Sequence, residues 1–212
     1  MKRRRFLSSM AFILPGAVVG TGVFFPSCKS EMKEGAFTED DIKLLDEIGE
    51  TIIPASSTSP GAKAAKIGEF MKVYVTDCYN AADRETFIEG ISSFKKLSKK
   101  KYGNEFLKLT VSQKQSLLKA LEKEAQEHAM AKHKRRSASG NGDAIQTGKA
   151  EFDDKNKMKE NSDHYFTMIK NITLFGYFTS EPGATKALRY IQTPGYFAGD
   201  IPYKKGDKSW AS

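Results

Sequence analysis

Apolar residues recur along most of the chain at spacings of three and four, the pattern of helices that bury one face. The first such stretch begins after Thr38, and its apolar positions are Ile42, Leu45, Ile48 and Ile52. Thr38 and Asp41 have the spacing of a capping box, and Pro54 ends the pattern, so a helix is predicted between them. No run of alternating apolar residues predicts a sheet, so the expected fold class is all-α.

The same spacing predicts further helices over about 64–80, 83–99 and 111–125, and another after Asp163. In the first of these, the apolar face ends at Cys78, which is therefore expected to be a buried small hydrophobic residue. Asp83 is the predicted cap of the second. The third is predicted to begin at a capping box formed by Thr110 and Gln113. Its apolar face is expected to consist of Val111, Leu117, Leu118 and Leu121.

Residues 126–161 differ in kind, because large apolar residues nearly vanish and basic residues, Ser, Gly and Asn accumulate. This composition predicts a solvated helix end followed by a polar, mobile loop. The expected domain is a small bundle of five to six helices over residues 37–212, interrupted by this loop.

The C-terminal segment is rich in aromatic residues: 10 of the 23 in the chain lie between Tyr165 and Ser212. From Gly195 onward the chain is too rich in Gly and Pro for a helix. Such an irregular aromatic segment must pack on something. It either completes the core of its own domain or docks on another protein, where Tyr and Trp contribute strongly to binding.

The first 27 residues have the pattern of an export signal, with a basic start and then no charge from Phe6 onward. Arg3, Arg4, Phe6 and Leu7 resemble the twin-arginine export motif, which directs folded proteins out of the bacterial cytoplasm. Cys28 follows a small residue and is a candidate for lipidation, with residues 28–36 as a tether. An uncleaved membrane anchor and simple cleavage are the alternatives.

Half of the formal net charge of +8 belongs to this signal, because the signal carries four basic residues and no acidic one. About +4 then remains for the rest of the chain. An excess of that size gives little support to nucleic-acid binding.

The sequence offers no convincing reactive site. Two cysteines and three histidines exclude a four-thiolate cluster, and no Cys-x-x-Cys-His attaches a haem. His128 and His133 are five residues apart, on different faces of a helix, so they form a poor metal pair. No phosphate loop, dinucleotide fingerprint or serine nucleophile elbow is present in the required context. Catalytic, cofactor-binding and metal-binding residues are therefore all predicted to be absent from this chain.

Three stretches together resemble subunit 3, the small subunit, of membrane-associated gluconate 2-dehydrogenase. They are the helix end and turn within Leu44–Ala62, the segment Gly176–Ala184 (GYFTSEPGA), and Ala187–Tyr190 with Pro194-Gly195-Tyr196. The resemblance extends over nearly the whole chain after the signal, except for 126–161, and the twin-arginine signal also agrees with it.

The resemblance implies an accessory subunit without a cofactor of its own, in a complex on the periplasmic side of a bacterial membrane. Its partners would be an FAD-containing dehydrogenase subunit, which it escorts through export, and a cytochrome subunit carrying haem c. Residues proposed to contact the partner, or to form a turn supporting that contact, are Tyr177, Phe178, Ser180, Gly183, Tyr190, Pro194, Gly195, Tyr196, Tyr203 and Trp210. The alternatives are a periplasmic lipoprotein with a ligand in a helical pocket, and an enzyme built from scattered carboxylates and tyrosines.

Overall fold

The computed structural model describes residues 37–138, 159, 161–193, 195, 199, 200, 202 and 204–211. The predicted export signal with Arg3, Arg4, Phe6 and Leu7, the tether with Cys28, and Pro194, Tyr196 and Tyr203 lie outside these residues.

The described chain is helical, as predicted. Its α-helices are α2 (Glu39–Ile52), α3 (Ile67–Cys78), α4 (Ala81–Tyr102), α5 (Val111–Ala138) and α7 (Tyr165–Thr179). Short 3₁₀ turns, η1 (Ala62–Ala65) and η2 (Phe106–Lys108), precede α3 and α5, and a π-helical turn, η3 (Gly183–Ala187), follows α7. Between described residues the only β-type pairing is an isolated bridge, Arg189 with Trp210.

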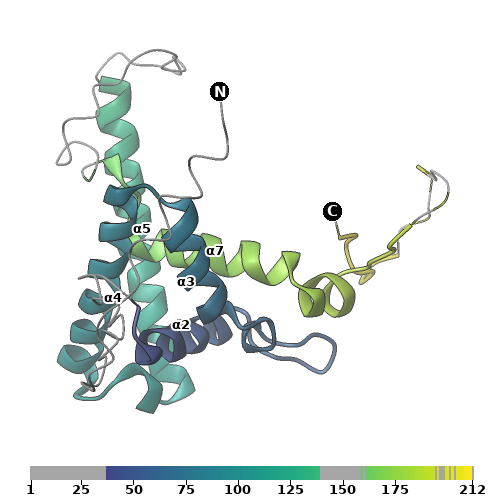
Figure 1. Cartoon of the computed structure of the whole chain (residues 1–212), viewed down its shortest axis with the longest axis horizontal. Coiled ribbons are helices and arrows are strands. Elements are labelled where there is room, and N and C mark those ends of the chain that lie inside the picture. The colour runs from purple at the N-terminus through teal and green to yellow at the C-terminus, as the bar shows by residue number, and fades with distance from the viewer. Residues whose placement is uncertain are drawn as a thin grey trace, which may run out of the picture. The chain divides into compact units, whose positions relative to one another are not determined.

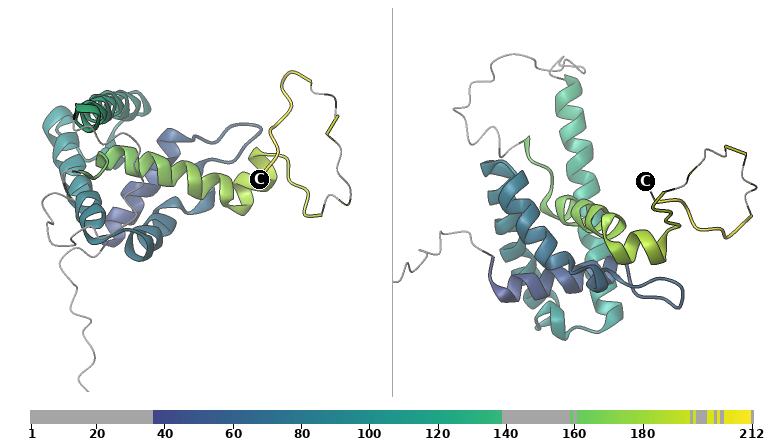
Figure 2. Two further views of the ribbon diagram at one scale, coloured as in Figure 1. Left: turned by 90° about the horizontal axis from the view of Figure 1, so that it is seen from above. Right: turned by 45° about the vertical axis from the view of Figure 1, so that its right-hand side comes forward.

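Helix α7 packs against α2, α3, α4 and α5, and so forms the centre of the domain (Figure 1). Both views of Figure 2 show its first turns beside α4 and α5 and its end continuing into η3. The core contains side chains from all five helices, among them Leu45, Met71, Phe87, Leu117 and Ile169, each fully buried. At the α4–α7 crossing, a Cβ on Gly90 would lie 2.3 Å from the Tyr165 side chain, so only glycine permits this approach.

Two helix starts agree with the sequence prediction in detail. The Thr38 Oγ1 accepts a hydrogen bond from the Asp41 backbone N–H, and the Asp41 carboxylate accepts one from the Thr38 N–H at 2.8 Å. The Gln113 side chain accepts one from the Thr110 N–H at 3.0 Å, and the Thr110 hydroxyl accepts one from the Gln113 N–H. Both capping boxes are local, which is why sequence alone could find them.

The structure corrects four predictions. Helix α4 is capped by Asn80, whose side chain accepts from the Asp83 N–H, so Asp83 lies inside the first turn. Helix α5 extends to Ala138, so it is longer than the predicted 111–125, and the solvated helix end expected within 126–161 reaches at least residue 138. Val111 is 70% exposed at the start of α5, and Cys78 is exposed at the end of α3. Both residues are terminal positions of their helices, where neighbouring elements do not cover the apolar face.

None of the helices in the described part of the chain is long and apolar enough to cross a lipid bilayer.

Candidate interaction surface

The described residues contain no group of three or more His, Cys, Asp or Glu side chains placed to hold a metal ion. The described residues do form two cavities, an exposed apolar face and an irregular C-terminal segment.

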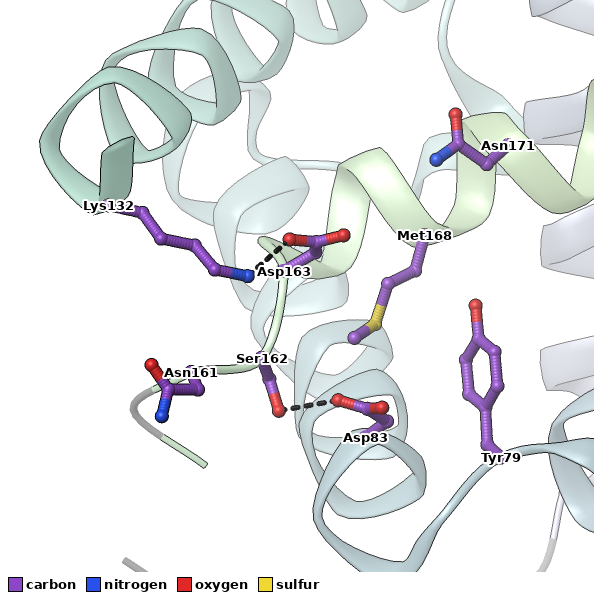
Figure 3. Close-up of a pocket in the computed structure, with 8 residues that line it drawn as sticks. All are labelled: Tyr79, Asp83, Lys132, Asn161, Ser162, Asp163, Met168 and Asn171. Carbon is purple, nitrogen blue, oxygen red and sulfur yellow. Dashed lines mark hydrogen bonds and ion pairs between the residues drawn. The ribbon is translucent and has the colours of Figure 1, made fainter. Parts of the chain in front are cut away.

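The first cavity, of about 280 Å³, lies beside the start of α7 (Figure 3). Its charged groups are paired with protein groups: Lys132 Nζ is 2.7 Å from Asp163 Oδ1, and the Ser162 hydroxyl donates to Asp83 Oδ1 at 2.6 Å. Burial raises the pKa of Tyr79 to about 12, so its phenol is neutral at any physiological pH. These contacts join α4 and α5 to residues 162 and 163, and thereby position the first turn of α7.

The second cavity, also of about 280 Å³, separates the start of α2 from α4. Lys95 Nζ lies 2.6 Å from Asp41 Oδ1 in its wall. Burial raises the pKa of Asp41, but hydrogen bonds from Lys95 and Thr38 outweigh this effect, so the net shift of the pKa is downward. Neither cavity is the enclosed apolar pocket that the ligand-binding alternative predicts.

An exposed apolar face runs along the second half of α7. Leu174, Phe175 and Phe178 point to solvent there, with Phe175 52% and Phe178 41% exposed. The neighbouring helix α3 extends this face with exposed Val73 and the half-buried rings of Phe70 and Tyr74. We call these six residues the α3–α7 face. The rings of Phe70, Tyr74 and Phe175 are in contact, and the other three residues lie one to three positions from them on the same two helices. Clustered exposed apolar side chains are typical of protein interaction sites rather than of ordinary scattered exposure.

The rings of this face contact one another. Ring centroids are 6.0 Å apart for Phe70 and Phe175, and 5.8 Å apart for Tyr74 and Phe175. Helix α3 can approach because Gly176 has no side chain: a Cβ there would lie 2.5 Å from the Phe70 ring. The aromatic rings are therefore held in place by packing, which lowers the entropy lost when a partner covers them.

Tyr177 has a different environment from its neighbour Phe178. It is only 1% exposed, and its hydroxyl donates to the Pro60 carbonyl and lies 2.9 Å from the Ser59 hydroxyl. This geometry matches the turn-supporting role considered for the segment and leaves Tyr177 unavailable for direct contact with a partner in this conformation.

Ser180 and Gly183 also belong to the turn. The Ser180 hydroxyl donates to the Tyr177 carbonyl at 2.6 Å and accepts from the Gly183 N–H at 3.2 Å. A Cβ on Gly183 would lie 1.8 Å from the Tyr177 carbonyl oxygen, so the position requires glycine. These two residues form the turn between α7 and η3.

The C-terminal segment returns to the body of the domain at its end. The Arg189 N–H donates to the Ser209 carbonyl at 2.8 Å, and the Ala211 N–H donates to the Arg189 carbonyl at 2.7 Å. The Arg189 guanidinium stacks 4.7 Å from the Trp210 ring centroid. Lys208 Nζ donates to the backbone carbonyls of Thr58, at 3.0 Å, and Lys186.

Three of the predicted contact residues in this segment are exposed: Tyr190 and Trp210, which are large, and Gly195, which has a positive φ of 71°. The segment therefore both closes on its own domain at Arg189 and presents aromatic side chains to solvent. Some residues of the segment thus pack on their own domain, while others remain accessible to a partner.

Of the six residues of the α3–α7 face, sequence reasoning proposed only Phe178 as a contact residue and missed the other five: Phe70, Val73, Tyr74, Leu174 and Phe175. A signal was available, because Leu174, Phe175 and Phe178 are one and four residues apart and lie opposite the face formed by Phe166, Ile169, Ile172 and Gly176. A helix that is apolar on both sides is expected to be covered on both sides.

The fold and these surfaces define a small all-α domain whose most prominent feature is an uncovered aromatic face. Comparison with family models matches residues 39–195 to gluconate 2-dehydrogenase subunit 3. The chain belongs to the gluconate 2-dehydrogenase subunit 3 family. This family membership implies that the protein is part of an oxidoreductase complex. Neither the curated proteins nor the solved structures contain a match to it.

Proposed function

We propose that this chain is a non-catalytic accessory subunit of a flavin-dependent sugar or sugar-acid dehydrogenase on the periplasmic side of a bacterial membrane. It binds the FAD-containing subunit, escorts it through twin-arginine export and helps to hold it at the membrane. In this proposal the flavin belongs to the large subunit and haem c to a cytochrome subunit, and this chain contributes neither group. Membership of the family and the Arg3-Arg4-x-Phe6-Leu7 motif support it.

The observation that carries the proposal is the α3–α7 face. Burying exposed Leu and Phe side chains in a protein interface contributes roughly 25 cal/mol per Å² of apolar surface. Two aromatic side chains at the centre of an interface are the kind of residue on which most of the binding energy rests. We assign this surface to the flavoprotein subunit, the main partner in the proposed complex.

Docking is tested with Phe175→Ser and Phe178→Ser, introduced together, in cells that produce the whole complex. We expect recovery of the flavoprotein with the tagged accessory subunit to fall at least tenfold, since each aromatic anchor contributes about 1–2 kcal/mol. The matched control is Met130→Ser, which removes an exposed apolar residue from α5, and recovery should remain unchanged. Unchanged recovery with the folded double variant would exclude this face as the docking site.

Escort is tested separately with Arg3→Lys and Arg4→Lys. We expect both this chain and the flavoprotein to remain in the cytoplasm, because the flavoprotein is proposed to depend on this signal. A flavoprotein that still reaches the periplasm would refute the escort role while leaving docking intact. Dehydrogenase activity of the purified chain alone would support the enzyme alternative instead.

A further inference from the structure

The corner between α4 and α5 combines exposed lysines with exposed apolar side chains. We propose that this corner rests on the surface of an anionic phospholipid membrane. It consists of the lysines and apolar residues of the last turns of α4, of η2 and of the start of α5: Lys95, Lys96, Lys99, Lys100, Lys101, Leu107, Lys108 and Val111. The inference rests on the proposed membrane attachment and specifies which part of the domain faces the lipid.

Two apolar side chains project from this corner because their neighbours are anchored inside. Phe106 and Leu109 are buried, and the Phe106 ring lies 4.9 Å from the Phe94 ring. Leu107, between them, is consequently turned outward and 42% exposed, and Val111 follows at 70%. The domain thus presents Leu107 and Val111 at a tip whose backbone is fixed.

Hydrogen bonds within the turn add to this rigidity. The Ser98 hydroxyl donates to the Asn104 carbonyl at 2.9 Å, and the Gly103 N–H donates to the Lys99 carbonyl at 2.8 Å. Gly103 has a φ of 71°, the left-handed conformation that ends α4. A fixed turn loses little conformational freedom when it meets a surface.

The charge around this tip is strongly positive. Lys96 and Lys100 form no ion pair within the described part of the chain, and Lys99 and Lys108 share one partner, Glu105, at 3.4 and 3.8 Å. With Lys95 paired to Asp41, the six lysines exceed these two acids by four charges. The acids Glu39 and Asp40 and the base Lys43 lie on the adjoining turn of α2 and reduce the excess to three.

The start of α2, which follows the predicted tether in the sequence, lies beside this corner, and this supports the lipid as its partner. The described chain begins at Phe37, and Lys95 binds Asp41 of the first turn of α2, so α2 starts beside the last turns of α4. Figure 1 shows the α4–α5 connection at the same lower end of the ribbon as the start of α2. Eight residues lie between Cys28 and Phe37, and the nine steps from one to the other span at most about 30 Å at roughly 3.3–3.6 Å per step. A lipid on Cys28 would therefore keep the start of α2 within that distance of the bilayer.

An anionic membrane fits this combination better than nucleic acid or an acidic protein does. Lysines near an anionic surface each contribute about 1 kcal/mol, and small apolar side chains among them can enter the headgroup region. In Figure 1 the α4–α5 connection lies away from the end of α7, so the two proposed contacts use different parts of the domain.

Vesicle binding tests the proposal with the mature protein carrying Cys28→Ser, so that no acyl chain contributes. We expect it to sediment with vesicles of phosphatidylglycerol and phosphatidylcholine, and only weakly with phosphatidylcholine alone. Lys96→Gln with Lys100→Gln should weaken binding about 30-fold, as about 1 kcal/mol per lysine is about fivefold. Val111→Ser should weaken it severalfold without changing the charge.

The matched control is Lys204→Gln with Lys205→Gln, which removes the same charge from two exposed lysines of the C-terminal segment. Its binding should stay within twofold of the parent protein. The proposal is overturned if the parent protein does not bind anionic vesicles, if both double variants lose binding equally, or if the corner variant binds normally. Loss of flavoprotein recovery by the corner variant with normal vesicle binding would assign the corner to the protein partner instead. Because vesicle binding needs no flavoprotein, failure here is distinct from failure of the docking test.

Discussion

The hydroxyl group of Tyr177 donates a hydrogen bond to the backbone carbonyl of Pro60, which lies 117 positions earlier in the chain. The Ser59 hydroxyl, at 2.9 Å, completes the environment of this phenol. The contact fixes the loop between α2 and η1 against the last turn of α7. The same contact therefore positions both the end of α7, which carries part of the α3–α7 face, and the turn that follows it.

Removing only the hydroxyl group, with Tyr177→Phe, should lower the free energy of unfolding by about 1 kcal/mol, because the Pro60 carbonyl loses its buried donor. For a domain of this size that corresponds to a fall in Tm of about 2–4 °C, measured by circular dichroism. Tyr190→Phe is the control, since Tyr190 is exposed. A Tyr177→Phe variant as stable as the parent would show that the hydrogen bond contributes nothing net.

Gly183→Ala should be far more damaging than an ordinary glycine replacement. Its Cβ would lie 1.8 Å from the Tyr177 carbonyl oxygen, so the turn after α7 must move. We expect a loss of about 2–4 kcal/mol in the free energy of unfolding, measured by urea denaturation. Gly49→Ala within α2 is the comparison, because its nearest neighbours are 3.4 Å away and alanine favours a helix. Equal effects of the two substitutions would contradict the close approach.

The Glu47 carboxylate should make stability depend on acid pH. Burial raises its pKa, but hydrogen bonds from Lys114, at 2.6 Å, and Lys63 outweigh this and lower it below the ordinary value of 4.5. A lowered pKa in the folded state adds stability that is complete above about 4.5 and is lost as the pH falls through the folded-state value. Urea denaturation should therefore show stability declining below about pH 4.5.

Lys114→Met tests which partner is responsible. Since the side chain of Lys114 is nearly buried, its loss should cost about 1–3 kcal/mol at pH 7, less than for a fully buried pair because Lys63 remains. The variant should also lose less additional stability on acidification than the parent protein does. Lys43→Met removes a lysine from an exposed pair with Asp40 and should change neither quantity by more than a few tenths of a kcal/mol. An unchanged pH profile in Lys114→Met would assign the lowered pKa to Lys63.

The sequence predicted what depends on neighbours along the chain. The helix starts at Thr38 and Thr110 follow from residues three positions apart, and the α7 core face follows from its periodicity. It failed where distant elements decide the outcome. Tyr177 and Phe178 are adjacent aromatics, yet one is buried under Pro60 and the other faces solvent, because only the tertiary fold sets which face of α7 is covered.

The length of α5 was underestimated for a related reason. Beyond Ala125 the helix buries little, and what favours it is a run of good helix formers together with contacts such as Lys123 with Glu127 and Lys132 with Asp163. An apolar pattern cannot reveal a helix of this kind. A regular apolar face indicates a helix only where that face is buried, and the second half of α5 buries little.

The exposure of Cys78 leads to a thiol count that also tests lipidation. In the folded, mature protein, Cys78 should react with an aromatic disulfide reagent at a rate comparable with that of the urea-unfolded chain. If Cys28 carries a lipid, each chain should release one equivalent in urea, and Cys78→Ser should release none. If Cys28 remains as a free thiol, the values become two and one. The mass of the mature N-terminus would distinguish an acylated Cys28 from its removal by cleavage. If Cys78 reacts only after unfolding, its exposed position at the end of α3 is contradicted.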